Sequence, residues 1–328
     1  MKKKITIGTR GSKLALIYAK IAEKNINKFK SKFSIKSVGI KKVTTKGDRI
    51  QNKRLSDVGG KGLFTKKIEN ELLNKKIDVA VHALKDIPSR VSKKLYTNCF
   101  LKRNDPREVL ITRNKKKFNN LPKNSIVGTS SYRREFQLKR IRKDLIYKLI
   151  RGNVDTRVNK LNNKFYDAII LSYAGLKVLR MNNKVSQVFS LSEIIPSAGQ
   201  GVIALQCRKN DLRITQLLEA INHTPTNICA NAERDVLKVL DGDCETPVGV
   251  NARIQNKKLN IVTELFSLDG KKRFYLGSSK KLYLAHLAGK ELGEKIKKRS
   301  KNLYKKKKIN AYFIYQTIWW LPWINVKI

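Results

Sequence analysis

Short apolar runs alternate with longer segments of helical periodicity through residues 4–221, and this alternation constrains the fold more than any other feature. Strands are predicted at 4–9, 34–44, 77–84, 108–112, 125–129, 146–150, 167–172 and 202–207. Helices are predicted at 13–29, 63–75, 131–142, 153–162, 173–181 and 211–221. Strands that alternate with helices indicate α/β units with parallel sheets, and an apolar run such as 169–171 indicates a strand covered on both faces.

The pattern changes after residue 222. Thr224 and Pro225 open a further predicted helix, because proline is favoured in the first turn. Strands are then predicted at 248–254, 259–266 and 273–278, and a helix at 281–298. This order predicts a smaller α+β domain, and a length of 328 residues is compatible with two or three domains.

The chain is strongly basic, with 72 lysines and arginines against 25 aspartates and glutamates and a formal net charge of +47. One interpretation is a polyanionic partner, because a basic face attracts nucleic acids and membranes. The other is compositional drift, since lysine far outnumbers arginine and the lysines are scattered along the whole chain. A nucleic-acid-binding protein needs a basic stripe with stacking aromatic residues, whereas the aromatic residues here fall mostly in apolar core patterns. We therefore expect no nucleic-acid partner.

The C-terminal residues 305–328 form a basic run followed by an apolar, aromatic segment. That segment is too short to span a bilayer, and Gln316 and Pro322 interrupt it. Aromatic residues beside lysines could lie at a membrane surface, but a terminal extension explains them without a membrane. We favour the extension and expect no membrane partner.

The cysteines and histidines predict neither a disulfide framework nor a metal site. The four cysteines are Cys99, Cys207, Cys229 and Cys244, and none belongs to a C-x-x-C pair. No metal is expected, because metal-ligand spacing is absent from the three histidines, His82, His223 and His286. The N-terminus lacks the long apolar stretch of a signal peptide. A reducing, cytoplasmic location is the simplest interpretation.

Arginines occur at three predicted junctions between a strand and the following helix, where ligands bind in α/β sheets. Helix N-termini there present free N–H groups, and a guanidinium pairs with a carboxylate or phosphate through two hydrogen bonds. These junctions predict a cleft for a ligand with several anionic groups. The alternative is that each arginine pairs with an acidic residue of the protein itself. The arginines are Arg10, Arg133 and Arg134 after 129–131, and Arg151 with Arg157.

Two further residues suggest chemistry. Cys244 lies in the polar turn LDGDCETPVG, where an exposed thiol is reactive while a buried one only packs. Asp86, in HALKDIPS, follows an apolar strand and could stabilise a cation or move a proton. The alternative for Asp86 is a turn-forming role before Ile-Pro. A non-catalytic pair of binding lobes would need the arginines but neither Cys244 nor Asp86.

Taken together, these segments resemble the hydroxymethylbilane synthase (porphobilinogen deaminase) family over about residues 4–300. The resemblance rests on motifs in the family's order: TRGSKLAL, TKGD, VGGKGLF, DVAVHALKDIP, DPRE, IVGTSSYRR, RGNVDTR, YDAIILSYAGL, SAGQG and DGDCETPVG. It implies two α/β lobes similar to type II periplasmic binding proteins and a smaller C-terminal α+β domain that carries Cys244. The implied boundaries are 1–101 with 200–220 for lobe 1, 105–196 for lobe 2 and 223–304 for the third domain, and the tail 305–328 is not covered.

The resemblance also implies a reaction. Four porphobilinogen molecules are joined head to tail, each with loss of ammonia, to give hydroxymethylbilane in tetrapyrrole (haem) biosynthesis. The primer is a dipyrromethane cofactor, one per chain, attached to Cys244 through a thioether. By similarity, Asp86 is catalytic, and the family works as a monomer without metal. The residues implied to hold cofactor carboxylates are Lys85, Thr129, Ser131, Arg133 and Arg134, and those implied to hold substrate are Arg10, Ser12, Arg151 and Arg157.

Four positions depart from the family's pattern. Asp57 stands where a lysine is usual, and Val178 where an arginine is usual. Asp243 and Glu245 flank Cys244 in place of glycine and glutamine. Because each change removes positive charge or adds negative charge beside a polyanionic ligand, we expect weaker substrate binding or slower elongation and slower loading of the cofactor. The substitutions Asp57→Lys and Val178→Arg are expected to improve the kinetics.

Overall fold

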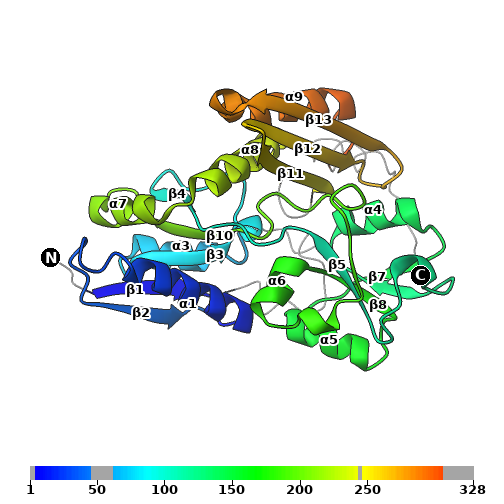
Figure 1. Cartoon of the computed structure of the whole chain (residues 1–328), viewed down its shortest axis with the longest axis horizontal. Coiled ribbons are helices and arrows are strands. Elements are labelled where there is room, and N and C mark those ends of the chain that lie inside the picture. The colour runs from blue at the N-terminus through cyan, green and yellow to red at the C-terminus, as the bar shows by residue number, and fades with distance from the viewer. Residues whose placement is uncertain (1–3, 46–61, 243–245, 306–328) are drawn as a thin grey trace, which may run out of the picture.

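The structure is a computed structural model and describes residues 4–45, 62–242 and 246–305. These residues form three sheets, each with its own helices (Figure 1). Two are five-stranded, with strand orders β2-β1-β3-β10-β4 and β7-β6-β8-β5-β9, and the third has the order β11-β12-β13. We call these bodies the first lobe, the second lobe and the third domain. The predicted fold class, two α/β lobes and a smaller α+β domain, is confirmed.

The first lobe is built from parallel β1, β2 and β3 with antiparallel β10 between β3 and β4. Its apolar core includes Ile5 and Ile7 of β1 and Leu217 of α7, all almost fully buried. Ser12 caps α1, since its Oγ accepts a hydrogen bond from the Ala15 amide, which confirms the predicted N-cap. The strands are β1 (Lys4–Thr9), β2 (Ser37–Lys42), β3 (Val79–Ala83), β4 (Leu95–Phe100) and β10 (Ile203–Arg208). The helices are α1 (Lys13–Asn27), α3 (Lys66–Leu73) and α7 (Leu212–Ile221).

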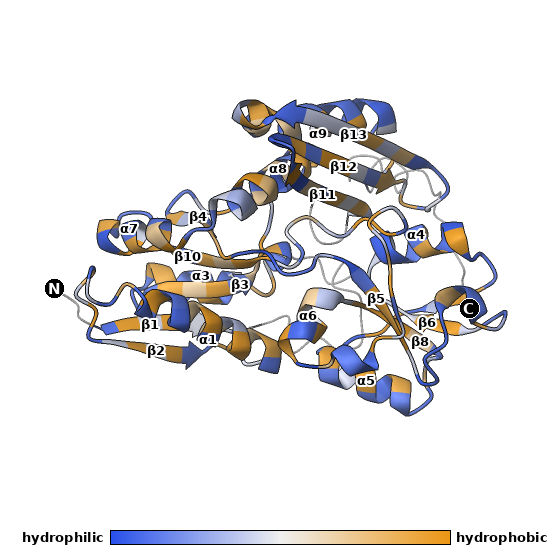
Figure 2. Cartoon of the chain, viewed as in Figure 1, coloured by the Kyte–Doolittle hydropathy of each residue, from blue (hydrophilic) through white to orange (hydrophobic). Residues whose placement is uncertain are grey.

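The second lobe repeats this plan with different connections. Strands β6, β7 and β8 run parallel, and β5 pairs antiparallel with β8 and β9. The strands are β5 (Glu108–Thr112), β6 (Ile126–Gly128), β7 (Ile146–Lys148), β8 (Ala168–Ser172) and β9 (Gln187–Val188). The helices are α4 (Tyr132–Ile141), α5 (Val154–Asn162) and α6 (Tyr173–Val178). Hydrophobic segments in Figure 2 follow the strands of both lobes, as expected for sheets covered on both faces.

The third domain is an antiparallel sheet with two helices packed together beside it. Its elements are α8 (Thr224–Leu240), β11 (Val248–Gln255), β12 (Lys258–Phe266), β13 (Arg273–Lys281) and α9 (Ala285–Ser300). Gly289 allows the helices to approach closely, because a Cβ there would collide with the carbonyl oxygen of Ala232. Short 3-10 helices lie at Leu84–Asp86, Phe118–Asn120, Asn182–Lys184 and Leu282–Leu284.

The expectation of parallel sheets holds for β1, β2 and β3 and for β6, β7 and β8, but it is wrong for the pairings of β10 and β5. The chain crosses between the lobes twice, through 101–107 and 189–202, and the strands that follow these crossings, β5 and β10, run antiparallel to their neighbours. The crossing segments touch where the Asn104 amide donates to the Gly201 carbonyl at 2.8 Å. Gly201 has a φ of +82°, and a Cβ there would lie 2.5 Å from the Asn104 oxygen, so this contact needs glycine.

Two strands were missed, β4 and β9. The sequence of β4, LYTNCF, mixes polar and apolar residues without clear alternation, and β9 has only two residues. The last helix begins at Ala285 because the preceding residues complete β13 and a 3-10 turn. Within the described ranges, no helix combines the length and the apolar character that a membrane crossing requires. Of the C-terminal tail 305–328, all but Lys305 lies outside the described residues.

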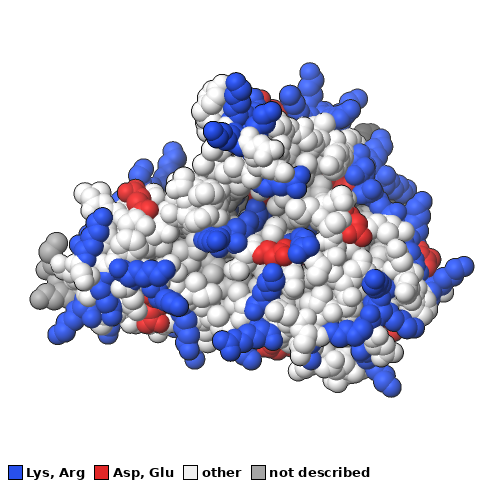
Figure 3. Space-filling model, viewed as in Figure 1, with Lys and Arg blue, Asp and Glu red and all other residues white. Residues whose placement is uncertain are grey.

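Lysines and arginines are spread over the three bodies on the face shown in Figure 3 and do not gather into one stripe there. This distribution agrees with the scattered lysines of the sequence.

Candidate active site

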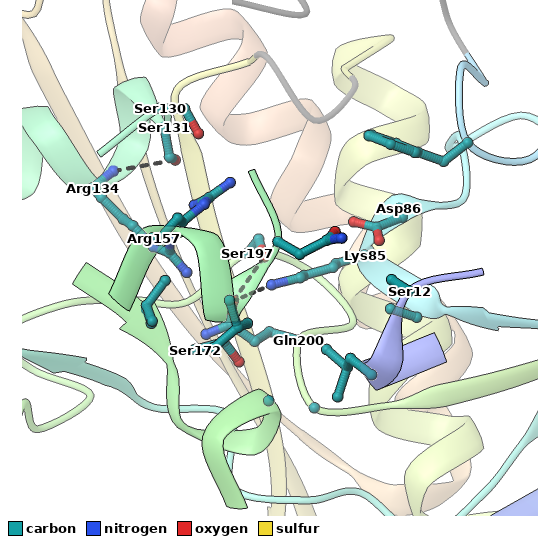
Figure 4. Close-up of a pocket in the computed structure, with 18 of the residues that line it drawn as sticks. Ser12, Lys85, Asp86, Ser130, Ser131, Arg134, Arg157, Ser172, Ser197 and Gln200 are labelled. Atoms are coloured by element: carbon teal, nitrogen blue, oxygen red, sulfur yellow. Dashed lines mark hydrogen bonds between the residues drawn. The ribbon is translucent and has the colours of Figure 1, made fainter. Parts of the chain in front are cut away.

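A cavity of about 400 Å³ lies where the two lobes and the third domain meet. Figure 4 shows Ser131, Arg134 and Arg157 on one side of it and Ser12 and Asp86 on the other. Its lining is strongly basic, with seven lysines and arginines against Asp86 and Asp155 among the described residues. The predicted site residues that line it are Arg10, Ser12, Lys85, Asp86, Ser131, Arg133, Arg134, Arg151 and Arg157.

Helix N-termini bring two serines to the cavity. Ser12 caps α1, and Ser131 caps α4 by accepting a hydrogen bond from the Arg134 amide at 3.5 Å. Thr129 is fully buried and does not line the cavity. Its Oγ1 accepts from the Ser131 amide at 3.2 Å, so Thr129 positions the serine rather than facing the cavity. The Arg10 guanidinium lies 4.1 Å from the centre of the Phe64 ring, which holds it at the cavity wall.

Arg133 and Arg134 share a carboxylate that the sequence did not reveal. Glu108 of β5 is completely buried and accepts from Nη2 of Arg133 at 2.7 Å and from Nη2 of Arg134 at 2.8 Å. Burial raises the pKa of Glu108, but the two guanidinium groups lower it more, to about 2. Nη1 of Arg133 also donates to the Ile195 carbonyl at 3.0 Å. Arg133 is therefore paired with an acidic residue of the protein itself, which was the alternative to binding an anionic ligand.

One hydrogen-bond donor of Arg134, its Nε, remains for a ligand. Its Nη1 donates to the Ile170 carbonyl at 3.1 Å, while its Nε is buried and has no hydrogen-bond acceptor within the described residues. A buried donor without an acceptor is costly unless a bound molecule supplies one. Figure 4 shows this side chain beside Ser131 and Arg157. The orphaned Nε therefore points to an anionic or carbonyl-bearing occupant.

Burial, and then repulsion by neighbouring arginines, lowers the pKa of two cations of the cavity. Burial and then Arg134 lower the pKa of Lys85 to about 8, and its Nζ lies 3.4 Å from Oε1 of Gln200. Burial, Arg134 and Arg151 lower the pKa of Arg157 to about 10, although its Nε donates to the Gly152 carbonyl at 2.9 Å. Cations held together in this way favour a ligand with several carboxylates or phosphates.

Asp86 is the acidic group among these cations. It ends the 3-10 turn Leu84–Asp86 that follows β3, and the Leu84 amide donates to the Val202 carbonyl at 2.9 Å. Its negative charge acts on nearby groups: burial first, and then Asp86, raises the pKa of Tyr18 to about 12. A carboxylate inside a cationic cavity can stabilise positive charge on a substrate and accept or return a proton.

The described residues on both sides of 243–245 border the cavity. Thr246 and Val248 line it, and the Gly242 carbonyl accepts a hydrogen bond from Oγ of Ser89, another lining residue, at 2.8 Å. Cys244, its neighbours Asp243 and Glu245, and Asp57 lie outside the described residues. Among the described residues, His, Cys, Asp and Glu side chains do not form a group of three that could hold a metal ion.

Sequence reasoning missed Glu108 and Gln200 as functional residues. Gln200 is fully buried, donates to the Pro106 carbonyl at 2.7 Å and accepts from Lys85 and from Oγ of Ser197. Both lie in motifs that the sequence displays, DPRE and SAGQG, but no local pattern shows that they orient cavity cations.

Val178 has an apolar environment, which changes the expectation that Val178→Arg improves the kinetics. It is half-buried in α6 and packs against the core of the first lobe. Arginine there would lose this contact across the lobes, so Val178→Arg is expected to destabilise the protein by about 1–2 kcal/mol instead of improving it. Thermal unfolding of Val178→Arg beside Val178→Leu tests this, and an arginine variant as stable as the wild type with improved kinetics would restore the earlier expectation.

Two family models match the sequence. One is described as "Porphobilinogen deaminase, dipyromethane cofactor binding domain" and matches residues 5–216. The other is described as "Porphobilinogen deaminase, C-terminal domain" and matches residues 227–298. The first covers both lobes except Lys4 and the end of α7, including the cavity residues up to Val202. The second covers the third domain except for the first residues of α8 and the end of α9.

Curated relatives carry the same name. The porphobilinogen deaminase of Alkaliphilus metalliredigens is 41% identical over 268 residues, or 82% of this chain and 84% of the relative. That of Rickettsia bellii is 44% identical over 270 residues, covering 82% and 89%. That of Rickettsia typhi is 47% identical over 246 residues, covering 75% and 81%. A solved structure, the periplasmic aliphatic sulphonate binding protein SsuA of Escherichia coli, is similar with a TM-score of 0.41 at 13% identity, covering 73% of this chain and 70% of that one.

Proposed function

The chain belongs to the porphobilinogen deaminase family, whose enzymes are the hydroxymethylbilane synthases, and we propose how its own residues perform the family's reaction. The enzyme is a transferase of tetrapyrrole (haem) biosynthesis that polymerises porphobilinogen into hydroxymethylbilane, and it uses a dipyrromethane cofactor. The observation that carries the assignment of roles is the basic cavity, where repelling cations surround Asp86 and an unsatisfied Arg134 Nε.

The cavity fits the cofactor. A dipyrromethane carries two acetate and two propionate groups. The cavity offers them a buried donor on Arg134 and a Lys85 ammonium whose pKa burial and Arg134 lower to about 8. We propose Cys244 as the covalent anchor and Lys85, Ser131 and Arg134 as the groups that hold the carboxylates. Thr129 and Arg133 act through them, since Thr129 bonds to the Ser131 amide and Arg133 shares Glu108 with Arg134. When bound, the dipyrromethane supplies the pyrrole carbon to which the first substrate is joined.

The remaining cations suit the substrate. Each porphobilinogen brings an acetate and a propionate, and Arg10, Arg151 and Arg157 line the cavity beyond Arg134. Guanidinium groups pair with carboxylates in two hydrogen bonds, which fixes the orientation of the ring as well as its position. The Ser12 hydroxyl accepts from the Ala15 amide and still has its own proton to donate to a substrate carboxylate.

Asp86 provides the electrostatic and proton-transfer chemistry. As ammonia leaves the aminomethyl group of porphobilinogen, positive charge spreads onto the pyrrole nitrogen of the substrate. The Asp86 carboxylate stabilises that charge by accepting a hydrogen bond from the pyrrole N–H. The pyrrole carbon that forms the new carbon–carbon bond would have to give up its hydrogen as a proton, and Asp86 would accept that proton and pass it on.

Lys85 gives the cavity a pH dependence when the cofactor is missing. Its pKa of about 8 in the folded protein lies below the usual 10.5 of a lysine. Its charge therefore opposes folding increasingly as the pH falls from 10.5 towards 8 and in full below about 8, and a bound dianion reverses this effect. Sulfate is therefore expected to raise the melting temperature of cofactor-free Cys244→Ser more at about pH 7 than at about pH 9. Lys85→Met in the same background is the control that should lose the difference. An equal sulfate effect at both pH values would contradict the role of Lys85.

Ammonia release and product formation test the function directly. With porphobilinogen as the sole substrate, we expect one hydroxymethylbilane for every four ammonia molecules released. A non-catalytic pair of binding lobes would bind porphobilinogen in a calorimetric titration and release no ammonia. We also propose that the enzyme works as a monomer, as the family resemblance implies, and in a reducing cytoplasm, because its four cysteines show no disulfide framework. A molar mass of one chain in light scattering tests the first part.

A further inference from the structure

Arg234 is a buried guanidinium that the reaction described above does not use. It lies in α8 of the third domain and is only 5% exposed. Its Nη1 donates to the Ile87 carbonyl at 3.2 Å, and its Nη2 donates to the carbonyls of Pro88 at 2.7 Å and Ser89 at 3.4 Å. These acceptors belong to the three residues that directly follow Asp86.

The acceptors of Arg234 make this an unusual way to bury a positive charge. The hydrogen bonds described for it all run to main-chain carbonyls, and burial lowers its pKa to about 10 despite the nearby Asp235. A buried charge without a close carboxylate is costly, because carbonyl dipoles replace water only in part. A planar guanidinium is nevertheless suited to the place, since its fork reaches adjacent carbonyls that a single ammonium cannot span.

The same short segment also contacts the start of the cofactor-bearing region. Oγ of Ser89 donates to the Gly242 carbonyl at 2.8 Å, and both atoms are buried. α8 carries Arg234 and ends at Leu240, so fewer than two helical turns separate Arg234 from the end of the helix that leads to Gly242. Residues 87–89 are therefore held from two points of the third domain, α8 itself and Gly242 just after its end, whose amide donates to the Leu237 carbonyl of α8 at 2.9 Å.

We propose that Arg234 is a positioning residue for Asp86. By holding the carbonyls of residues 87–89, it fixes the end of the 3-10 turn Leu84–Asp86 and thereby the direction of the Asp86 carboxylate within the cavity. The contact also sets Asp86 in a defined place relative to the third domain, which supplies the cofactor anchor. The inference rests on the catalytic role proposed for Asp86.

Steady-state kinetics of Arg234→Met and Arg234→Lys test the proposal. Arg234→Met is expected to lower kcat about 10- to 100-fold with little change in KM, because a carboxylate displaced by about 1 Å loses its geometry with the reacting atoms. Arg234→Lys retains one donor and is expected to recover part of kcat. The pH profile of kcat is expected to shift in Arg234→Met, since the carboxylate meets a different set of cations. Intact mass spectrometry shows whether each variant still carries the cofactor.

Arg208→Met is the matched control. Arg208, in the first lobe, is likewise a buried arginine that donates to two carbonyls, of Leu72 at 2.9 Å and Ile77 at 2.7 Å, and it does not line the cavity. Unlike Arg234, it also pairs with the carboxylates of Asp78 and Asp211. The Arg208→Met variant is expected to lose thermal stability but to keep the kcat and the pH profile of the wild type, measured well below its melting temperature.

The proposal is overturned if Arg234→Met, folded and carrying its cofactor, keeps the kcat and pH profile of the wild type, or if Arg208→Met loses kcat to the same extent. Should Arg234→Met fail to fold, Arg234→Lys alone tests the proposal: a lowered kcat supports it and an unchanged kcat overturns it. Asp86→Asn, assayed in parallel, separates the two levels: an inactive Asp86→Asn with an unaffected Arg234→Met rejects only the positioning role.

Discussion

Replacing Asp86 with asparagine is expected to lower kcat about 1000-fold while the protein keeps its fold and its cofactor. Asparagine is close to aspartate in shape but carries no negative charge, so it can neither stabilise the positive pyrrole nitrogen as strongly nor accept a proton. The cavity increases the effect, because the basic lining outnumbers its acidic residues and no other carboxylate lies on the 3-10 turn Leu84–Asp86. Stopped or steady-state assays of ammonia release measure the loss.

Asp155→Asn is the control for Asp86→Asn. Asp155 also lines the cavity, in the first turn of α5, so its replacement makes the same change of charge and size in the same basic surroundings. We expect it to change kcat less than tenfold. If the two variants lose activity equally, the loss reflects the charge of the cavity as a whole, and the specific role of Asp86 is wrong.

Replacing Cys244 with serine is expected to remove the cofactor and with it all measurable product formation. A thiolate attacks carbon far more readily than a neutral hydroxyl, so serine cannot form the thioether linkage or an efficient substitute for it. The other three cysteines do not replace it. Cys99, Cys207 and Cys229 are buried, and burial raises the pKa of each thiol, to about 11 for Cys207 and Cys229.

Cys229→Ala provides the matched control for Cys244→Ser. Cys229 lies in α8 of the same domain, packed in its core. We expect this variant to keep the cofactor and its turnover with a loss of stability of about 1 kcal/mol. Turnover in Cys244→Ser, or its absence from folded Cys229→Ala, would show that the anchor has been misassigned.

The sequence predicts the elements of this fold better than their directions. Apolar runs and helical spacing reveal most strands and helices within a few residues, because both depend on local burial. The antiparallel insertion of β10 between β3 and β4 depends on the two crossings between the lobes, and nothing local to 203–208 encodes it. β4 was missed for a related reason, since its partner is far away in sequence and its own residues lack a clear period.

The candidate site, too, is predictable from the sequence only in part. Motifs place Arg10, Asp86 and Arg157 on segments that meet at one cavity, because strand ends and helix starts gather ligands in α/β folds. The sequence does not show that Glu108 pairs with Nη2 of both Arg133 and Arg134. Nor does it show that the Thr129 hydroxyl accepts a hydrogen bond from the Ser131 amide. Such roles depend on which side chain faces a buried partner from another strand, and a single sequence has no signal for that pairing.

Intact mass spectrometry of the purified protein, expressed with porphobilinogen available, is the decisive test of Cys244 as the cofactor anchor. We expect an added mass equal to two porphobilinogens less two ammonias, and peptide mapping should locate it on Cys244. After brief exposure to substrate, we expect further species heavier by one porphobilinogen less one ammonia. A bare thiol at Cys244 in active, freshly prepared protein would show that Cys244 is not the anchor.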